Sequence, residues 1–162
     1  MSLRFTRFAS ALAALLTLSL AGFAGAEGHG EDDPIVGYRQ MVMSAIGANM
    51  GAIGDIMKNR LSLPGAVANH AEQMADAAAL IGPAFKKEVH AGATDAKPEI
   101  WANWAEFEAA VAKFEEAARG LAAASAAGDP KAIGPAMKTL GQSCGGCHDD
   151  FRKPKEESYK KK

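Results

Sequence analysis

Cysteine is scarce in this sequence. Among 162 residues only Cys144 and Cys147 are cysteines, so there is no second cysteine pair to complete the usual four-ligand zinc site. A disulfide between residues three positions apart would close a very small loop and would add little stability. A structural zinc site and a stabilising disulfide are therefore poor explanations of this pair.

Two further patterns are missing. No stretch alternates apolar and polar residues for long enough to predict a β-strand, and no glycine-rich phosphate loop follows a strand. A thioredoxin-like redox dithiol needs a strand before its helix, so this chain does not favour one. The formal net charge of −1 argues against nucleic acid or an anionic membrane as the main partner.

Long apolar runs are also absent after the first 26 residues. The segment 1–26 has a basic head, an apolar run from Phe8 to Leu20 and a small-residue ending at Ala26, the layout of a secretory signal peptide. We expect cleavage after Ala26 and export to the periplasm, with an uncleaved anchor as the alternative. The run is too short to span a bilayer comfortably, and no membrane span is expected in the rest of the chain.

Helical periodicity is what the sequence does contain. After a flexible N-terminus, 27–33, apolar residues recur at steps of three and four, and Asp-Pro pairs mark the first and last helix starts. The pattern predicts an all-α fold, an antiparallel up-down four-helix bundle over 34–153. The expected helices are 34–59, 63–81, 98–127 and 130–153. The charged C-terminal tail, 154–162, is expected to be solvated, with a docking patch as the alternative.

The cysteines open the motif Cys144-Gly-Gly-Cys147-His148, and C-x-x-C-H is the pattern of c-type haem attachment. Residues three apart share a helix face, so both thiols can reach the two vinyl groups on one edge of the porphyrin. His148, one step further, can turn its imidazole to the iron as the proximal ligand. The motif predicts one covalently attached haem c.

Three stretches resemble class II cytochromes c, the cytochrome c′ family: "YRQMVMSAIGANMGAI" (38–53), "KPEIW" (97–101) and "CGGCHDDFRK" (144–153). The resemblance covers nearly all of the chain after residue 26. It implies an up-down four-helix bundle, a topology of which this family is itself a well-known example, with the haem motif near the C-terminus.

The resemblance also assigns site residues. Cys144 and Cys147 match the thioether cysteines and His148 the proximal ligand. Arg39 matches an arginine near a haem propionate, Gln40 is its neighbour in the same motif, and Arg152 matches a basic residue beside the proximal ligand. Met43 falls at the family's distal position, where the low-spin branch has its axial methionine and high-spin members have a residue that does not bond the iron.

Two other residues compete with Met43 as the sixth iron ligand. Met41 would point about 200° away from Met43 around the helix, at roughly 100° per residue, so the two cannot both face the iron. His70 lies on the apolar stripe of the second helix and could in principle reach it.

Features after Met43 look more like the low-spin branch, and they favour a one-electron carrier of the periplasm with iron held by His148 and Met43. Such a protein is not an enzyme, and its partners would be other periplasmic redox proteins, met transiently by a monomer or homodimer. The alternative is a high-spin cytochrome c′ that binds nitric oxide or other small gases at an open distal site. A helical binding protein without haem, with incidental cysteines, is the third possibility.

Overall fold

Helices make up almost all of the regular structure in residues 33–161, the part of the chain that the computed structural model describes. The predicted signal peptide, 1–26, and the predicted flexible segment up to residue 32 lie outside the described residues. The elements are α1 (Pro34–Asn59), α2 (Ala66–Phe85), α3 (Glu99–Ala102), α4 (Trp104–Ala126), α5 (Pro130–Phe151) and two 3₁₀ turns, η1 (Lys155–Glu157) and η2 (Tyr159–Lys161). Within this range no helix is long and apolar enough to cross a membrane.

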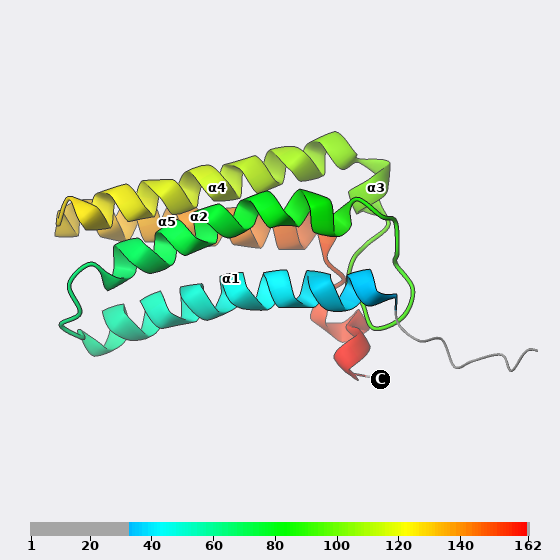
Figure 1. Cartoon of the computed structure of the whole chain (residues 1–162), viewed down its shortest axis with the longest axis horizontal. Coiled ribbons are helices and arrows are strands. Elements are labelled where there is room, and N and C mark those ends of the chain that lie inside the picture. The colour runs from blue at the N-terminus through cyan, green and yellow to red at the C-terminus, as the bar shows by residue number, and fades with distance from the viewer. Residues whose placement is uncertain (1–32, 162) are drawn as a thin grey trace, which may run out of the picture.

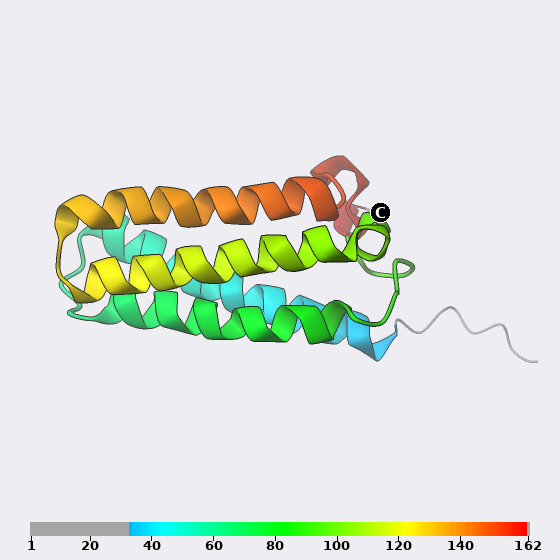
Figure 2. The same cartoon turned by 90° about the horizontal axis from the view of Figure 1, so that it is seen from above.

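The four long helices run alternately up and down, which confirms the predicted bundle (Figure 1). Each packs on the next along the chain: α1 on α2, α2 on α4, and α4 on α5 (Figure 2). Direct contacts between the first and last helices, α1 and α5, are few. The bundle is therefore not closed by direct packing between these two helices, and they can line a cavity together.

Two helix starts are fixed by local chemistry, as predicted. The Asp33 carboxylate accepts a hydrogen bond of 3.1 Å from the Ile35 backbone N–H at the start of α1. The Asp129 carboxylate accepts one of 3.0 Å from the Lys131 N–H at the start of α5. A proline follows each aspartate in the first turn of its helix. N–H groups in the first turn have no intrahelical acceptor, so the missing proline N–H costs no hydrogen bond.

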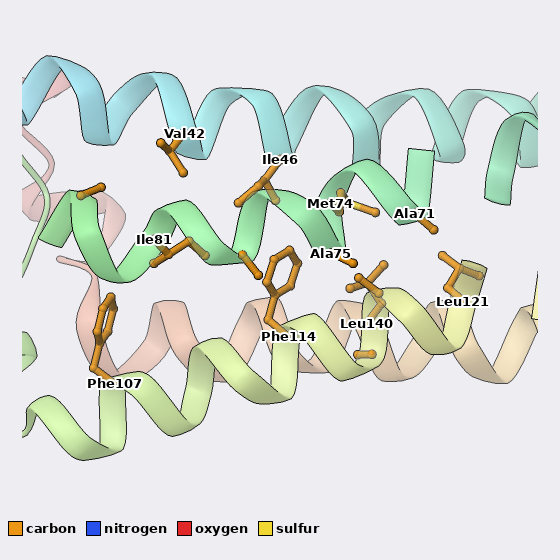
Figure 3. Packing of buried hydrophobic residues seen from close by; sticks show 14 of the residues in the cluster. Val42, Ile46, Ala71, Met74, Ala75, Ile81, Phe107, Phe114, Leu121 and Leu140 are labelled. Atoms are coloured by element: carbon orange, nitrogen blue, oxygen red, sulfur yellow. The ribbon is translucent and has the colours of Figure 1, made fainter. Parts of the chain in front are cut away.

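The core lies along the bundle axis and draws on all four long helices (Figure 3). Its labelled members are buried apolar side chains: Val42, Ile46, Ala71, Met74, Ala75, Ile81, Phe107, Phe114, Leu121 and Leu140. Burying a large apolar side chain stabilises the fold by roughly 1.5–3 kcal/mol. The ring of Phe107 also lies 5.3 Å, centroid to centroid, from the rings of both Phe85 and Phe151, so aromatic contacts join α2, α4 and α5 at one end.

The second helix differs from its prediction at both ends. It begins at Ala66, not at 63, because Gly65 has a positive φ of 77°, a turn conformation that glycine adopts without strain. It continues past Gly82 and Pro83 to Phe85.

Side chains from other elements stabilise that extra turn. Arg39 Nε donates 2.9 Å to the Ala84 carbonyl, and Trp101 Nε1 donates 2.8 Å to the Phe85 carbonyl. These donors satisfy carbonyl groups that a helix end otherwise leaves without a partner.

The third predicted helix, 98–127, is divided. Asn103 leaves the helical conformation with φ −124° and ψ 49°, and this separates α3 from α4. Its carbonyl then accepts 3.0 Å hydrogen bonds from the N–H groups of Glu106 and Phe107, so a new helix starts at once.

The last helix also differs from expectation. Helix α5 ends at Phe151 because Arg152 is extended and forms an isolated bridge with Ala96. Most of the tail is exposed, but Ser158 is buried with 7% of its surface exposed and Tyr159 is half-buried. The tail folds back on the loop before α3 because that loop offers it hydrogen-bond acceptors.

Candidate haem-binding site

A cavity of about 540 Å³ lies between α1 and α5, within the range of roughly 300–1,000 Å³ that small-molecule and cofactor sites occupy. Its lining comes from both of these helices, from α4, from the end of α2 and from the loop before α3. All seven site residues predicted from the sequence line it: Arg39, Gln40, Met43, Cys144, Cys147, His148 and Arg152. The fold thus brings together residues from opposite ends of the chain.

Helix α5 supplies the proximal wall. Cys144 and Cys147 are one helical turn apart, both half-buried and packed against the core, and both face the cavity. Two thiols on one wall of a cavity with a largely apolar lining fit a macrocycle attached by two thioether bonds.

The surroundings of the two thiols do not activate them. Burial raises the pKa of Cys144, and burial together with Cys144 and Asp150 raises the pKa of Cys147 to about 11. Reactive cysteines typically show the opposite shift. No disulfide joins the pair, and among residues 33–161 no cluster of three or more His, Cys, Asp or Glu side chains could hold a metal.

His148 lies on the same wall and keeps part of its surface in solvent. Partial burial of the ring is the main effect that lowers the pKa of His148, and the nearby Arg152 guanidinium lowers it further. Its imidazole is therefore neutral at pH 7, which is the form that binds iron. The residues present fit a covalent haem with His148 as the protein ligand.

Helix α1 supplies the opposite, distal wall. Met43 is half-buried, packs against the core and lines the cavity. Met41 also lines the cavity, but it is 64% exposed. His70 is not among the lining residues, and its Nδ1 is 2.7 Å from Asn49 Oδ1. Met43 is thus the one of these three that both lines the cavity and packs against the core.

Arg39 is the most buried charged residue at the site, with 3% of its surface exposed. Its Nε donates to the Ala84 carbonyl, its Nη1 donates 2.6 Å to the Val89 carbonyl, and its Nη2 donates to the Lys87 carbonyl. The guanidinium also lies 4.8 Å from the Phe85 ring centroid. Its contact with a haem propionate stays a prediction, and its described partners belong to the protein itself.

Gln40 and Arg152 also hold loop segments beside the cavity. Gln40 Nε2 donates 2.7 Å to the Ala93 carbonyl, and Arg152 Nη2 lies 3.2 Å from Asp95 Oδ2. Both residues keep a place on the cavity wall while tying α1 and α5 to the loop before α3.

The lining residues that the sequence did not mark include Asp95, Tyr159 and Lys160. Asp95 lies in an irregular stretch and the other two in the tail, where no periodic pattern or motif marks a role. Only the folding of the tail over the loop brings them to the cavity.

An all-α up-down bundle with a C-x-x-C-H motif on the inner face of its last helix defines a class of protein, the four-helix-bundle c-type cytochromes. Comparison with known proteins agrees with this class. The family described as Cytochrome C′ matches residues 34–152, and the chain belongs to the cytochrome c′ family.

Individual relatives support the assignment. Cytochrome c′ of Rhodospirillum rubrum is 36% identical over 144 residues, which cover 88% of this chain and 94% of that protein. Cytochrome c′ of Pararhodospirillum photometricum is 38% identical over 118 residues, covering 72% and 94%. The solved nitric oxide complex of a mutant of cytochrome c prime from Alcaligenes xylosoxidans has a TM-score of 0.67 and 31% identity, covering 75% of this chain and 95% of that chain.

Two conclusions follow from family membership. The chain carries one covalent haem c with iron, as predicted. The interpretation as a low-spin His/Met electron carrier is wrong, because these relatives are cytochromes c′ and support the gas-binding alternative. The mistake came from taking the residues after Met43 as a sign of the low-spin branch.

Proposed function

We propose that this protein binds nitric oxide or a similar small gas at a high-spin haem. Haem iron, when bound, supplies the coordination position for the gas. His148 would bind one side of the iron, and Cys144 and Cys147, which line the same wall, would attach the macrocycle to α5. Met43 covers the other side by packing and does not bond the iron.

The observation that carries the proposal is the character of the distal wall. From Met43 onward, α1 lines the cavity with Ile46, Gly47 and Met50, and its only polar side chain in that part of the lining is Ser44, whose hydroxyl is not a usual ligand of haem iron. An apolar wall excludes water and leaves room for a small uncharged ligand. The solved relative with bound nitric oxide supports the same interpretation.

The remaining expectations are proposals that rest on this function. A gas-binding protein does not convert its ligand, so we infer no enzymatic activity. We also infer export to the periplasm, occasional reduction of the haem by a transient redox partner, and existence as a monomer or homodimer.

Spectroscopy of the purified holoprotein tests the function. At neutral pH the ferric form should give high-spin absorption and electron paramagnetic resonance spectra, and the ferrous form should bind carbon monoxide and nitric oxide. A low-spin ferric spectrum with a methionine–iron charge-transfer band would contradict the proposal. A ferrous form that binds neither gas would do the same.

A further inference from the structure

The segment after α5 is a part of the chain that the family match does not include, since that match ends at Arg152. Residues 153–161 nevertheless have a defined place. Lys153 N–H donates 2.7 Å to the Asp95 carbonyl, and the chain then forms η1 and η2 beside the cavity, at the end of the bundle where α1 begins (Figure 1).

Asp95 fixes the end of this segment. Its Oδ1 accepts 3.0 Å from the Tyr159 backbone N–H, and its Oδ2 accepts 3.0 Å from Ser158 Oγ. The same Oδ2 lies 3.2 Å from Arg152 Nη2. Only 9% of the Asp95 side chain is exposed, so these are largely shielded, charge-assisted bonds, the stronger kind of hydrogen bond.

This anchoring brings Tyr159 and Lys160 to the wall of the haem cavity. Lysine and arginine contribute three side chains to that wall: Arg39, Arg152 and Lys160. Arg39 donates to three backbone carbonyls, and Arg152 is paired with Asp95. Within residues 33–161 the Lys160 ammonium has no carboxylate partner, and it lies 5.8 Å from the Tyr159 ring centroid.

A haem carries two propionate carboxylates on the edge opposite its thioether bonds, and a carboxylate beside a protein cavity is stabilised by a cation. A haem held by Cys144 and Cys147 on α5 would have its propionate edge directed away from that helix. Of the three, Lys160 is the cation whose side-chain nitrogen donates to no described carbonyl or carboxylate, whereas Arg39 is held by backbone carbonyls and Arg152 by Asp95.

We propose that Lys160 is a haem-propionate-binding residue and that Asp95 is its positioning residue. The C-terminal segment is then part of the haem site. This inference is independent of the gas-binding function, because a propionate needs a cation whatever the spin state of the iron.

Lys160→Gln, with Lys161→Gln as the matched control, tests the binding role in the holoprotein. Lys161 is the next residue and carries the same charge, but it lines a different hollow and not the haem cavity. The haem midpoint potential is measured as a function of pH. Loss of a cation beside the propionate should lower the potential and move its pH-dependent region to higher pH, because the ionised propionate loses stabilisation.

We expect Lys160→Gln to lower the midpoint potential and to move its pH-dependent region to higher pH. Lys161→Gln and Lys160→Arg should both give the parent curve. Equal curves for the two glutamine variants would overturn the proposal, whether both shift or neither does. The spin state of the iron, which tests the gas-binding function, is read separately from the absorption spectrum.

Tyr159→Pro, with Tyr159→Ala as its control, tests the positioning role. Proline removes the N–H that bonds Asp95 and changes no charge, whereas alanine keeps the N–H and loses only the ring. Proline fits the backbone, since Ser158 already has the extended conformation (φ −61°, ψ 136°) that a residue before proline prefers.

We expect Tyr159→Pro to reproduce the shift of Lys160→Gln and to speed tryptic cleavage after Lys155, measured by mass spectrometry. Tyr159→Ala should change the potential curve and the rate of tryptic cleavage much less. A parent-like potential curve in Tyr159→Pro would overturn the role of Asp95.

Discussion

The Nε of Arg39 in α1 donates a 2.9 Å hydrogen bond to the carbonyl oxygen of Ala84 in the last turn of α2. Two further nitrogens of the same guanidinium bind the carbonyls of Val89 and Lys87. A single buried side chain thus organises the loop that leads from α2 toward the haem cavity. Arg39 has a structural role in this protein in addition to any contact with the haem.

Replacing Arg39 should destabilise the fold. In Arg39→Ala three carbonyls lose a charged donor, so we expect the free energy of unfolding to fall by about 2–4 kcal/mol. Arg39→Lys should recover only part of this, because an ammonium cannot reproduce the planar set of donors. Urea unfolding followed by circular dichroism measures both.

Arg119 provides the control for that measurement. Its guanidinium is half-exposed and pairs with Glu72, Asp76 and Glu115 on the surface, where ion pairs contribute little. Arg119→Ala should therefore change stability far less than Arg39→Ala. Equal losses of stability in the two variants would mean that the buried Arg39 hydrogen bonds contribute no more than the surface ion pairs of Arg119.

The bundle and the haem site should be separable by mutation. Leu121 in α4 is fully buried but does not line the cavity. Leu121→Ala should reduce the free energy of unfolding by about 2–5 kcal/mol and leave the haem absorption spectrum unchanged. Leu80→Ala, at a 45% exposed position, should change stability by about 0.5 kcal/mol or less. A changed haem spectrum in Leu121→Ala would show that the core and the site are coupled.

Local sequence signals were sufficient for the parts of the fold that depend on near neighbours. The starts of α1 and α5 follow from Asp33 and Asp129, each of which accepts from a backbone N–H two residues ahead. The shared face of Cys144 and Cys147 follows from helical spacing alone. These predictions needed no knowledge of the tertiary structure.

Other features depend on groups far apart in the chain, and the sequence could not show them. The end of α2 is stabilised by Arg39 and Trp101, which lie 45 and 16 positions away from their acceptors. Asp95 meets the tail across 64 positions. The pairing of α1 with α5 around the cavity came from family resemblance, because helical periodicity does not determine which helices leave space between them.

Either of the two cysteines alone should be enough to keep the haem covalently attached. Either Cys144→Ser or Cys147→Ser leaves one thioether, so the haem should stay with the chain on a denaturing gel. The double variant should lose it, and the polypeptide mass should be that of the chain alone. Ser143→Ala, which is next to the motif and removes no thiol, should keep both thioether bonds. Covalent haem in the double variant would contradict attachment through these residues.

The stability of the protein should respond to acid through Asp95. Burial raises the pKa of this carboxyl, but hydrogen bonds from Tyr159, Ser158 and Arg152 outweigh it, and the net pKa lies below the ordinary value. A carboxyl with a lowered folded pKa contributes stability above the unfolded pKa, about 3.9 for Asp, and this contribution is lost as pH falls through the folded value.

Asp95→Asn should therefore lower the free energy of unfolding by about 1 kcal/mol near pH 6 and by much less near pH 3. Urea unfolding at the two pH values measures the difference. Asp76→Asn, at a carboxylate 69% exposed, should show little change at either pH. A loss in Asp95→Asn that is the same at both values would rule out titration of Asp95 as its cause.

Two substitutions of Met43 distinguish the effect of its side-chain volume from that of its sulfur atom. If Met43 only covers the distal side of the cavity, Met43→Leu keeps the bulk and should keep the high-spin spectrum and the parent rate of carbon monoxide binding. Met43→Ala opens the wall and should speed association about tenfold, the effect of a barrier lowered by ~1.4 kcal/mol. Flash photolysis of the ferrous protein measures these rates, with Met57→Ala, away from the cavity, as the control. A change from low-spin to high-spin iron in Met43→Leu would instead mean that the thioether bonds the iron, since only the sulfur is lost.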